Sequence, residues 1–296
     1  MHAVLPLKIK GDYNRYDLTR ARMLIYSIEQ FWSSTETFNL HVIVRDDELD
    51  IVERMLTAAK LSLHFLPETR LLPMLRDFAR VSGWYKQQVI KLAAYSIFDA
   101  NFYLTLDADL VCTKPFDESY FSADGRMLAD WEGRDIQRNW WIDSAKILGI
   151  APVLDGDGFK PTPEVFVPEV CQQLQAWLDA SFGDGGWPYL LRNLGWTENT
   201  LYNMFADQHG LTQRYHWDAG WMRKNRKAVR AWQSFSNEQG FEKWDPVSAF
   251  SPESPGLFMV CNSSSKVNPR RIWDKLSPLF PGQPDYSIID GSVEEN

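Results

Sequence analysis

The sequence predicts an α/β fold in which a central, mostly parallel β-sheet is flanked by helices. Residues 3–66 alternate between short apolar runs and amphipathic stretches in the order β-α-β-α-β, which favours a parallel, doubly wound sheet. Residues 102–106, Phe-Tyr-Leu-Thr-Leu, have the continuous apolar character of a strand buried on both faces. That run ends in Asp107 and Asp109, at the end of a strand where open α/β sheets place their ligands.

The first half of the chain supplies the clearest elements. We expect strands at residues 3–9, 39–44 and 61–66, the last of which is stopped by Pro67. Apolar residues recur at steps of three and four from Leu18 to Trp32, which indicates an amphipathic helix. A second helix is expected after the acidic residues 46–48, and a third at residues 84–98.

The pattern is weaker after residue 125. We expect a strand at 126–129, loops and short elements at 131–165, and a helix at 165–180. A short helix at 200–205 has Thr197 as its candidate N-cap. Residues 206–250 show little periodicity, and a late strand at 257–260 and a closing helix at 269–279 follow. We see no repeat and no linker between independent cores.

Composition excludes several classes of partner. The formal net charge of −8 argues against a nucleic-acid partner and against a polybasic membrane anchor. We expect no secretory signal and no transmembrane segment. Cys112, Cys171 and Cys261 are odd in number and lack metal-ligand spacing, so the expected location is the reducing cytoplasm. The 13 tryptophans fit either a core or a sugar-stacking surface.

Asp107 and Asp109 are the first candidate site. Residues i and i+2 at the end of a strand point to the same side, so the two carboxylates are expected to share one face. Carboxylates held that close repel each other unless a proton or cation lies between them, and Mg²⁺ and Mn²⁺ prefer such oxygens. The pattern favours a metal site that holds a phosphate-bearing substrate. A solvated acidic turn is the alternative.

Four stretches together resemble a known class. They are Gly-Trp-Tyr-Lys-Gln-Gln at 83–88, Tyr-Leu-Thr-Leu-Asp-Ala-Asp at 103–109, Pro-Thr-Pro at 161–163 and Trp-Thr-Glu-Asn-Thr-Leu-Tyr at 196–202. In this order they resemble the GT-A class of glycosyltransferases, and in particular a bacterial group of uncharacterised predicted members. The resemblance implies a Rossmann-like GT-A fold and one domain over residues 1–280. Within it, the donor-binding half would be about 1–130, the acceptor-side half about 131–280, and 281–296 a C-terminal tail.

The resemblance also implies a chemistry and its residues. The chain would move a sugar from a nucleotide-sugar donor, expected to be UDP-linked, to a hydroxyl of a glycan or other acceptor. Asp109 would bind Mn²⁺ or Mg²⁺ directly, and Asp107 would contact the donor sugar or ribose and reach the metal through water, with the metal neutralising the leaving diphosphate. Surface polysaccharide or glycoconjugate assembly is the setting implied by class analogy.

The resemblance to the GT-A class assigns roles to further residues less directly. Glu198 would be the general base, although Thr-Glu-Asn stands where many inverting members have Glu-Asp, so inversion or retention stays open. Lys86 and Gln88 would bind the donor in the first turn of a helix, and Lys86 and Lys91 could act as fixed charges or form a solvated helix face. Asp12 would bind nucleobase or ribose, or serve only in a turn.

The metal would also need a further ligand. Many members supply a His after the C-terminal strand, where this chain has Cys-Asn-Ser-Ser-Ser at 261–265. Asn262, Ser263 or water would fill that place, or else His209 or His216 would reach it.

Three other functions compete with this interpretation. A phosphatase of the haloacid dehalogenase type also carries Asp-x-Asp, but usually on the first strand of the chain. A nucleotidyltransferase of related fold uses the same metal logic but usually has a glycine-rich basic loop after the first strand, where residues 5–16 hold a single glycine. A non-catalytic carbohydrate-binding protein would suit the tryptophans, but the intact carboxylate pair counts against it.

Overall fold

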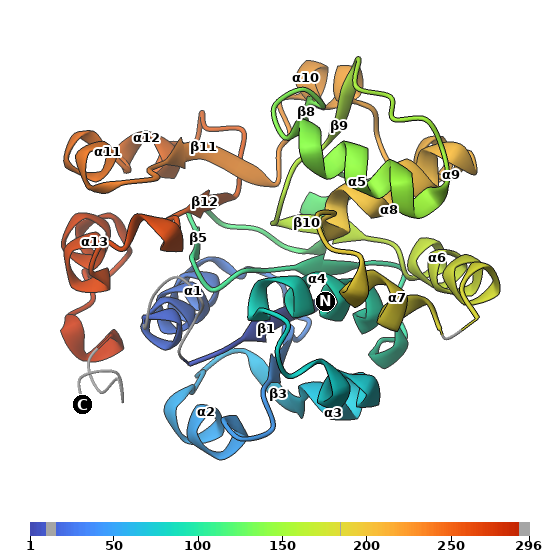
Figure 1. The fold of residues 1–296 in the computed structure, drawn as a ribbon. Coiled ribbons are helices and arrows are strands. Elements are labelled where there is room, and N and C mark those ends of the chain that lie inside the picture. Colours follow the sequence, from blue (N-terminus) through green and yellow to red (C-terminus); the bar gives the residue numbers. More distant parts are fainter. Residues whose placement is uncertain (10–15, 184, 290–296) are drawn as a thin grey trace.

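The computed structural model describes residues 1–9, 16–183 and 185–289 (Figure 1). Its largest sheet has the order β10-β4-β1-β2-β3. Strands β1 (His2–Leu7), β2 (Asn39–Val44), β3 (Ser62–Pro67) and β4 (Tyr103–Thr105) run parallel, and β10 (Glu164–Phe166) joins β4 antiparallel at the edge. The predicted α/β class with a mostly parallel central sheet is confirmed.

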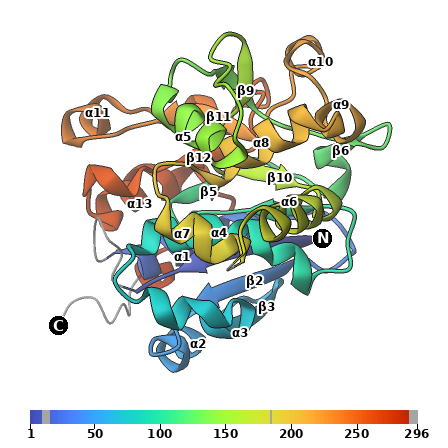
Figure 2. The same ribbon diagram turned by 45° about the vertical axis from the view of Figure 1, so that its right-hand side comes forward.

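The helices that connect these strands pack on the faces of the sheet (Figure 2). Helix α1 (Asp17–Phe31) connects β1 to β2, and α2 (Leu49–Met55) connects β2 to β3. The chain returns through α3 (Glu68–Leu71) and α4 (Gly83–Ala93) to β4 on the other side of β1. Because parallel crossovers are right-handed, α1 and α2 lie on one face of the sheet and α4 on the other. Strands are added outward from β1 to β3, and the chain then returns to place β4 on the other side of β1. This reversal in the direction of winding makes the boundary between β1 and β4 a topological switch point.

A second, three-stranded sheet follows the Asp-x-Asp turn. Its order is β11-β12-β5, with β5 (Leu110–Cys112), β11 (Arg230–Ser234) and β12 (Phe258–Val260). Strand β12 is antiparallel to β5 and parallel to β11. The run that we expected as one strand thus divides into β4 and β5, and the turn containing Asp107 and Asp109 joins the two sheets.

The second half of the chain is more helical than its sequence indicates. The expectation of loops at 131–165 is wrong for α5 (Arg138–Leu148), and the expected strand at 126–129 is reduced to β7 (Arg126–Met127), paired with β6 (Ser122–Ala123). Helix α5 was missed because it is short and stands among segments rich in Trp, Asp, Gly and Pro, although its buried residues Trp141, Ser144, Ala145 and Leu148 have helical spacing.

The remaining elements complete the fold around these sheets. Strand β8 (Trp131–Gly133) pairs with β9 (Asp157–Phe159), and α6 (Pro168–Ser181), α7 (Gly186–Arg192) and α8 (Glu198–Gln208) pack near α4. Helices α9 (Leu211–Tyr215), α10 (Ala219–Asn225), α11 (Glu238–Lys243) and α12 (Val247–Phe250) occupy the stretch without periodicity, and α13 (Pro269–Leu276) follows β12. Within the described residues, no helix combines the length and apolar character that a membrane span requires.

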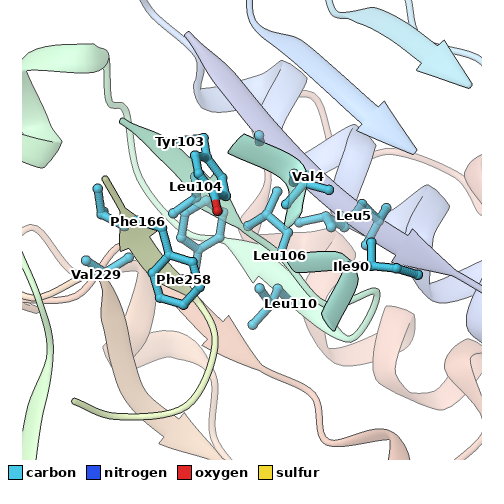
Figure 3. Close-up of a cluster of buried hydrophobic side chains, with 14 of the residues drawn as sticks. Val4, Leu5, Ile90, Tyr103, Leu104, Leu106, Leu110, Phe166, Val229 and Phe258 are labelled. Atoms are coloured by element: carbon cyan, nitrogen blue, oxygen red, sulfur yellow. The ribbon is translucent and has the colours of Figure 1, made fainter. Parts of the chain in front are cut away.

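The hydrophobic core connects both sheets. Figure 3 shows Val4 and Leu5 of β1 beside Leu104 and Leu106, with Phe258 of β12 in the same cluster. These side chains are fully buried. The turn that carries Asp107 and Asp109 is therefore anchored on both sides by rigid, buried strands. The predicted tail, 281–296, lies partly outside the described residues, and Ile289 is buried in the core.

Candidate active site

A cleft of about 430 Å³ opens at the carboxyl ends of β1 and β4. Residues 6–8 at the end of β1 and residues 107–109 after β4 line it, so it lies at the topological switch point of the sheet. The loop after β12 closes another side, with Asn262, Ser263 and Ser264 among the lining residues. Segments far apart in the sequence thus converge on the carboxylate pair.

One oxygen of each carboxylate is held by the protein. The Asp107 Oδ1 lies 2.7 Å from the ammonium of Lys91, and the backbone N–H of Ser263 donates to Asp109 Oδ2 at 2.6 Å. The carbonyl of Asp109 also accepts from the N–H of Cys261 at 2.7 Å, which ties the turn to the end of β12. Both side chains are half-buried and line the cleft, as the alternation of the strand end predicts.

Lys91 is a buried cation shared by two acids. Its ammonium lies 2.7 Å from Asp107, 2.9 Å from Glu198 Oε1 and 2.6 Å from Thr162 Oγ1. Burial lowers the pKa of Lys91, but the two carboxylates outweigh this effect and raise the pKa above its ordinary value. Lys91 therefore stays charged and fixes the position of Asp107. Its place in the core excludes the solvated helix face that the sequence left open.

Glu198 lies behind the cleft wall. Its Oε1 accepts hydrogen bonds from Lys91 and from Thr162 Oγ1, both at 2.9 Å, and its side chain is 5% exposed. Its backbone N–H donates to Gln88 Oε1 at 3.1 Å. Thr162 and Gln88 line the cleft, whereas Glu198 is absent from its lining. The general-base prediction for Glu198 stays a prediction, and these contacts indicate what else the carboxylate does.

The oxygen donors around the cleft fit a hard divalent cation. Asp107 and Asp109 each have a second carboxylate oxygen, and the adjoining loop adds hydroxyl oxygens of Ser263 and Ser264 and the amide oxygen of Asn262, which accepts from the N–H and hydroxyl of Ser264. Among the described residues, no group of three or more His, Cys, Asp or Glu side chains is arranged to hold a metal. A cation here would therefore depend on the two aspartates, neutral oxygens and water.

His209 and His216, the two histidines predicted as alternative metal ligands, do not line the cleft. His216 is buried beside Tyr202, whose hydroxyl lies 2.9 Å from its Nε2, and burial lowers the pKa of His216 to about 3. His209 is the C-cap of α8, and its Nδ1 lies 2.8 Å from the carbonyl of Phe205 in that helix. Neither residue lines the cleft, so the loop after β12 is the better source of further ligands.

A second pocket of about 430 Å³ adjoins the cleft at the ends of β1, β2 and β3. Residues 6–8, Gly83 and Gln87 line both spaces. Lys86 lines this second pocket and lies 3.3 Å from Glu68 Oε1, so the structure places it away from the carboxylate pair. Asp12, the predicted nucleobase or ribose ligand, lies outside the described residues.

Several lining residues escaped the sequence interpretation. Trp84 and Trp140 form an aromatic wall, with ring centroids 6.0 Å apart, and Arg230 reaches the cleft from β11. Trp84 belongs to the stretch that carries the resemblance, but Trp140 lies in the missed helix α5. Arg230 is one of several basic residues in an aperiodic segment, and only the pairing of β11 with β12 places it near the site.

Comparisons with known proteins support the α/β fold described above. The model of a family of unknown function (DUF6492) matches residues 1–283. No curated protein matches the sequence. Among solved structures, the apo form of mouse xyloside xylosyltransferase 1 is similar, with a TM-score of 0.54, 14% identity, and coverage of 90% of this chain and 99% of that chain. At this identity the similarity shows a glycosyltransferase-like fold.

Proposed function

We propose that this chain, which belongs to the family of unknown function DUF6492, is a metal-dependent glycosyltransferase that moves a sugar from a nucleotide-sugar donor to an acceptor hydroxyl. The observation that carries the proposal is the position of Asp107 and Asp109. They line a cleft at the switch point of a glycosyltransferase-like fold, together with Asn262, Ser263 and Ser264 of the loop that adjoins Asp109. A second pocket next to this cleft offers room for the nucleoside. A UDP-linked donor is our working choice.

In this proposal the residues divide the work. Asp109 and Asp107 hold Mn²⁺ or Mg²⁺, with amide and hydroxyl oxygens of Asn262 and Ser264 as further ligands. The cation supplies charge neutralisation to the departing diphosphate. Lys91 keeps Asp107 in place through their 2.7 Å contact, so that the carboxylate needs no rearrangement when donor binds. Gln88 and Trp84 line the same cleft and would contact the sugar side of the donor.

Glu198 has two possible roles here. As a base it would remove the acceptor proton, which requires access to the cleft. As a positioning residue it would hold Lys91 and Thr162 through its Oε1. We propose the positioning role, because Thr162 stands in the cleft lining and Glu198 does not.

The cytoplasm remains our proposed location. Cys112, Cys171 and Cys261 are free and buried. Burial raises the pKa of the Cys171 and Cys261 thiols to about 12, so both are protonated and unreactive at neutral pH. Unpaired thiols fit a reducing compartment.

The proposal is tested by ligand-dependent thermal unfolding and by release of UDP from UDP-sugars. Wild-type protein should gain stability when UDP and Mn²⁺ are present together, by about 2.7 kcal/mol at a ligand concentration 100 times Kd. Asp109→Ala should lose this gain and the release of UDP, because it removes a metal ligand. Asp99→Ala, at an exposed loop position outside both pockets, is the matched control and should behave as wild type.

Two outcomes would contradict the proposal. One is an Asp109→Ala protein that keeps the joint effect of UDP and Mn²⁺. The other is release of pyrophosphate from nucleoside triphosphates in place of UDP from UDP-sugars, which would favour a nucleotidyltransferase.

A further inference from the structure

A third pocket, of about 230 Å³, lies between β8, α10 and the start of β11. Twelve residues line it, and five of them are cationic: Lys160, Arg223, Arg226, Lys227 and Arg230. We call this space the basic pocket. Its character contrasts with the whole chain, whose formal net charge is −8. Asp130 and Glu132 lie near Lys160 and Arg230, and Glu164 also lies near Lys160, so the positive charge offered to an incoming anion comes mainly from Arg223, Arg226 and Lys227.

Asp130, the acid in the lining of the basic pocket, already accepts hydrogen bonds from backbone N–H groups. Asp130 is 5% exposed, and its two oxygens accept from the N–H groups of Val229 at 2.8 Å and Arg230 at 2.6 Å. Among the described residues that line the basic pocket, Asp130 is the single acid. Asp130 therefore fixes the start of β11, and with it the position of Arg230, while its charge is satisfied by backbone donors.

Arg223 and Arg226, the most exposed cations of the basic pocket, form only weak ion pairs. Arg223 lies 3.3 Å from Asp157 and Arg226 lies 3.8 Å from Glu253, and all four side chains are exposed. Exposed ion pairs of this kind contribute about 0–1 kcal/mol, so an incoming anion can replace them at little cost. The Lys227 ammonium lies 4.5 Å from the ring centre of Tyr120 and forms another wall.

The basic pocket adjoins the cleft at Arg230. Arg230 lines both spaces, and Lys160 directly precedes Pro161 and Thr162, which line the cleft. The other walls are apolar, with Trp131, Met222 and Pro255 among them. A flat aromatic surface beside cations suits a sugar ring that carries an anionic substituent.

We propose that the basic pocket binds an anionic sugar, a ring bearing a phosphate or a carboxylate, as part of the acceptor. Its assignment to the acceptor rests on the proposed function, because the pocket adjoins the cleft on the side of Arg230. The binding itself does not depend on that function. The chemistry requires only that the anion meet Arg223, Arg226 and Arg230 while the ring packs on Trp131.

Direct titration of the full chain tests this inference. The probes are α-D-glucose 1-phosphate, D-glucuronate and neutral D-glucose, measured by calorimetry or ligand-observed NMR without nucleotide or metal. At least one anionic sugar should bind saturably, with Kd on the order of 1 mM, and more weakly at high salt. The two anionic probes distinguish a phosphate from a carboxylate.

A double variant locates the binding. Arg223→Gln/Arg226→Gln should weaken binding about tenfold or more, the effect of losing a charge-assisted hydrogen bond. Lys146→Gln/Arg214→Gln is the matched control, because it also removes two exposed, ion-paired cations but touches neither the cleft nor the basic pocket. The control should bind as wild type does.

The inference is overturned if neither anionic sugar binds, if glucose binds as tightly, or if both double variants weaken binding equally. These results stand apart from the UDP and Mn²⁺ experiment. Anionic sugar binding with a failed Asp109 test would remove the proposed function and leave the pocket, and the reverse result would remove the pocket and leave the function.

Discussion

Lys91 is the residue on which the geometry of the carboxylate pair depends. It is 1% exposed and contacts one carboxylate from the end of β4, Asp107, and one from the start of α8, Glu198. A buried cation of this kind is stable only while its partners remain, and removing one partner of a buried pair costs about 3–5 kcal/mol. The charge on Lys91 is therefore a fixed part of the site, which Asp107 and Glu198 share.

The role of Glu198 can be decided by kinetics. Glu198→Gln keeps the shape and an acceptor oxygen for Lys91 and Thr162 but removes the charge. If Glu198 positions Lys91, we expect KM for the donor to rise several-fold, a kcat loss of less than about 10²-fold, and an unchanged pH profile. A general base would instead give a kcat loss of about 10²–10⁴-fold, an unchanged KM and loss of the acidic limb of the profile. That second pattern would contradict the positioning role.

Helix α8 presents Glu198 to the site from a fixed first turn. Thr197 is its N-cap, with a side chain that accepts from the N–H of Thr200, and Thr200 Oγ1 accepts in return from the N–H of Thr197 at 3.3 Å. The helix is buried along most of its length, which leaves its first N–H groups without access to water. The cap therefore determines both the stability of α8 and the position of its first residue.

We expect Thr197→Ala to destabilise the protein by about 1–2 kcal/mol in urea unfolding, because the buried N–H of Thr200 loses its acceptor. Thr197→Ser keeps the hydroxyl and should recover most of this loss. Thr57→Ala, at an exposed position after α2, should change stability by less than about 0.5 kcal/mol. Equal losses in the Ala and Ser variants would show that packing of the methyl group, rather than capping, is responsible.

At the scale of the whole molecule, stability should depend on pH through buried titratable groups such as His216 and Asp130. His216 is fully buried beside Tyr202, and burial lowers its pKa to about 3. In the unfolded chain the imidazole takes up a proton near pH 6.5. The unfolded state then binds more protons than the folded state below that pH, so stability falls as the pH drops from about 6.5 towards 3.

For His216 alone, this loss amounts to about 2 kcal/mol between pH 7 and pH 5. Burial raises the pKa of Asp130 to about 6, which acts in the opposite direction, but that effect is common to wild type and variant. His216→Gln keeps an acceptor for the Tyr202 hydroxyl and does not titrate. Urea unfolding at both pH values should show a smaller loss for the variant by about 2 kcal/mol; identical losses would mean that His216 titrates normally.

The alternation of strands and helices up to β4 could be predicted from the sequence, since parallel strands buried on both faces leave long apolar runs. Strand β2 was predicted at its observed bounds, and α1 within one residue of its observed bounds. The same buried run identified Asp107 and Asp109 as neighbours, because a strand end places residues i and i+2 on one side. These features are local, so local sequence is sufficient to determine them.

Tertiary structure decided which distant residues complete the site. Nothing in the local pattern indicates that Lys91 contacts both Asp107 and Glu198, or that Arg230 borders two pockets. The edge strand β10 and the helix α5 were also missed, because a strand of three residues gives little periodic signal and α5 is a short helix in a stretch rich in turn-forming residues. Sequence by itself therefore determined the sheet and its carboxylate pair. Packing between separate elements, some of them far apart in the sequence, determined which charges surround that pair, since those contacts arise only when the two sheets share one core.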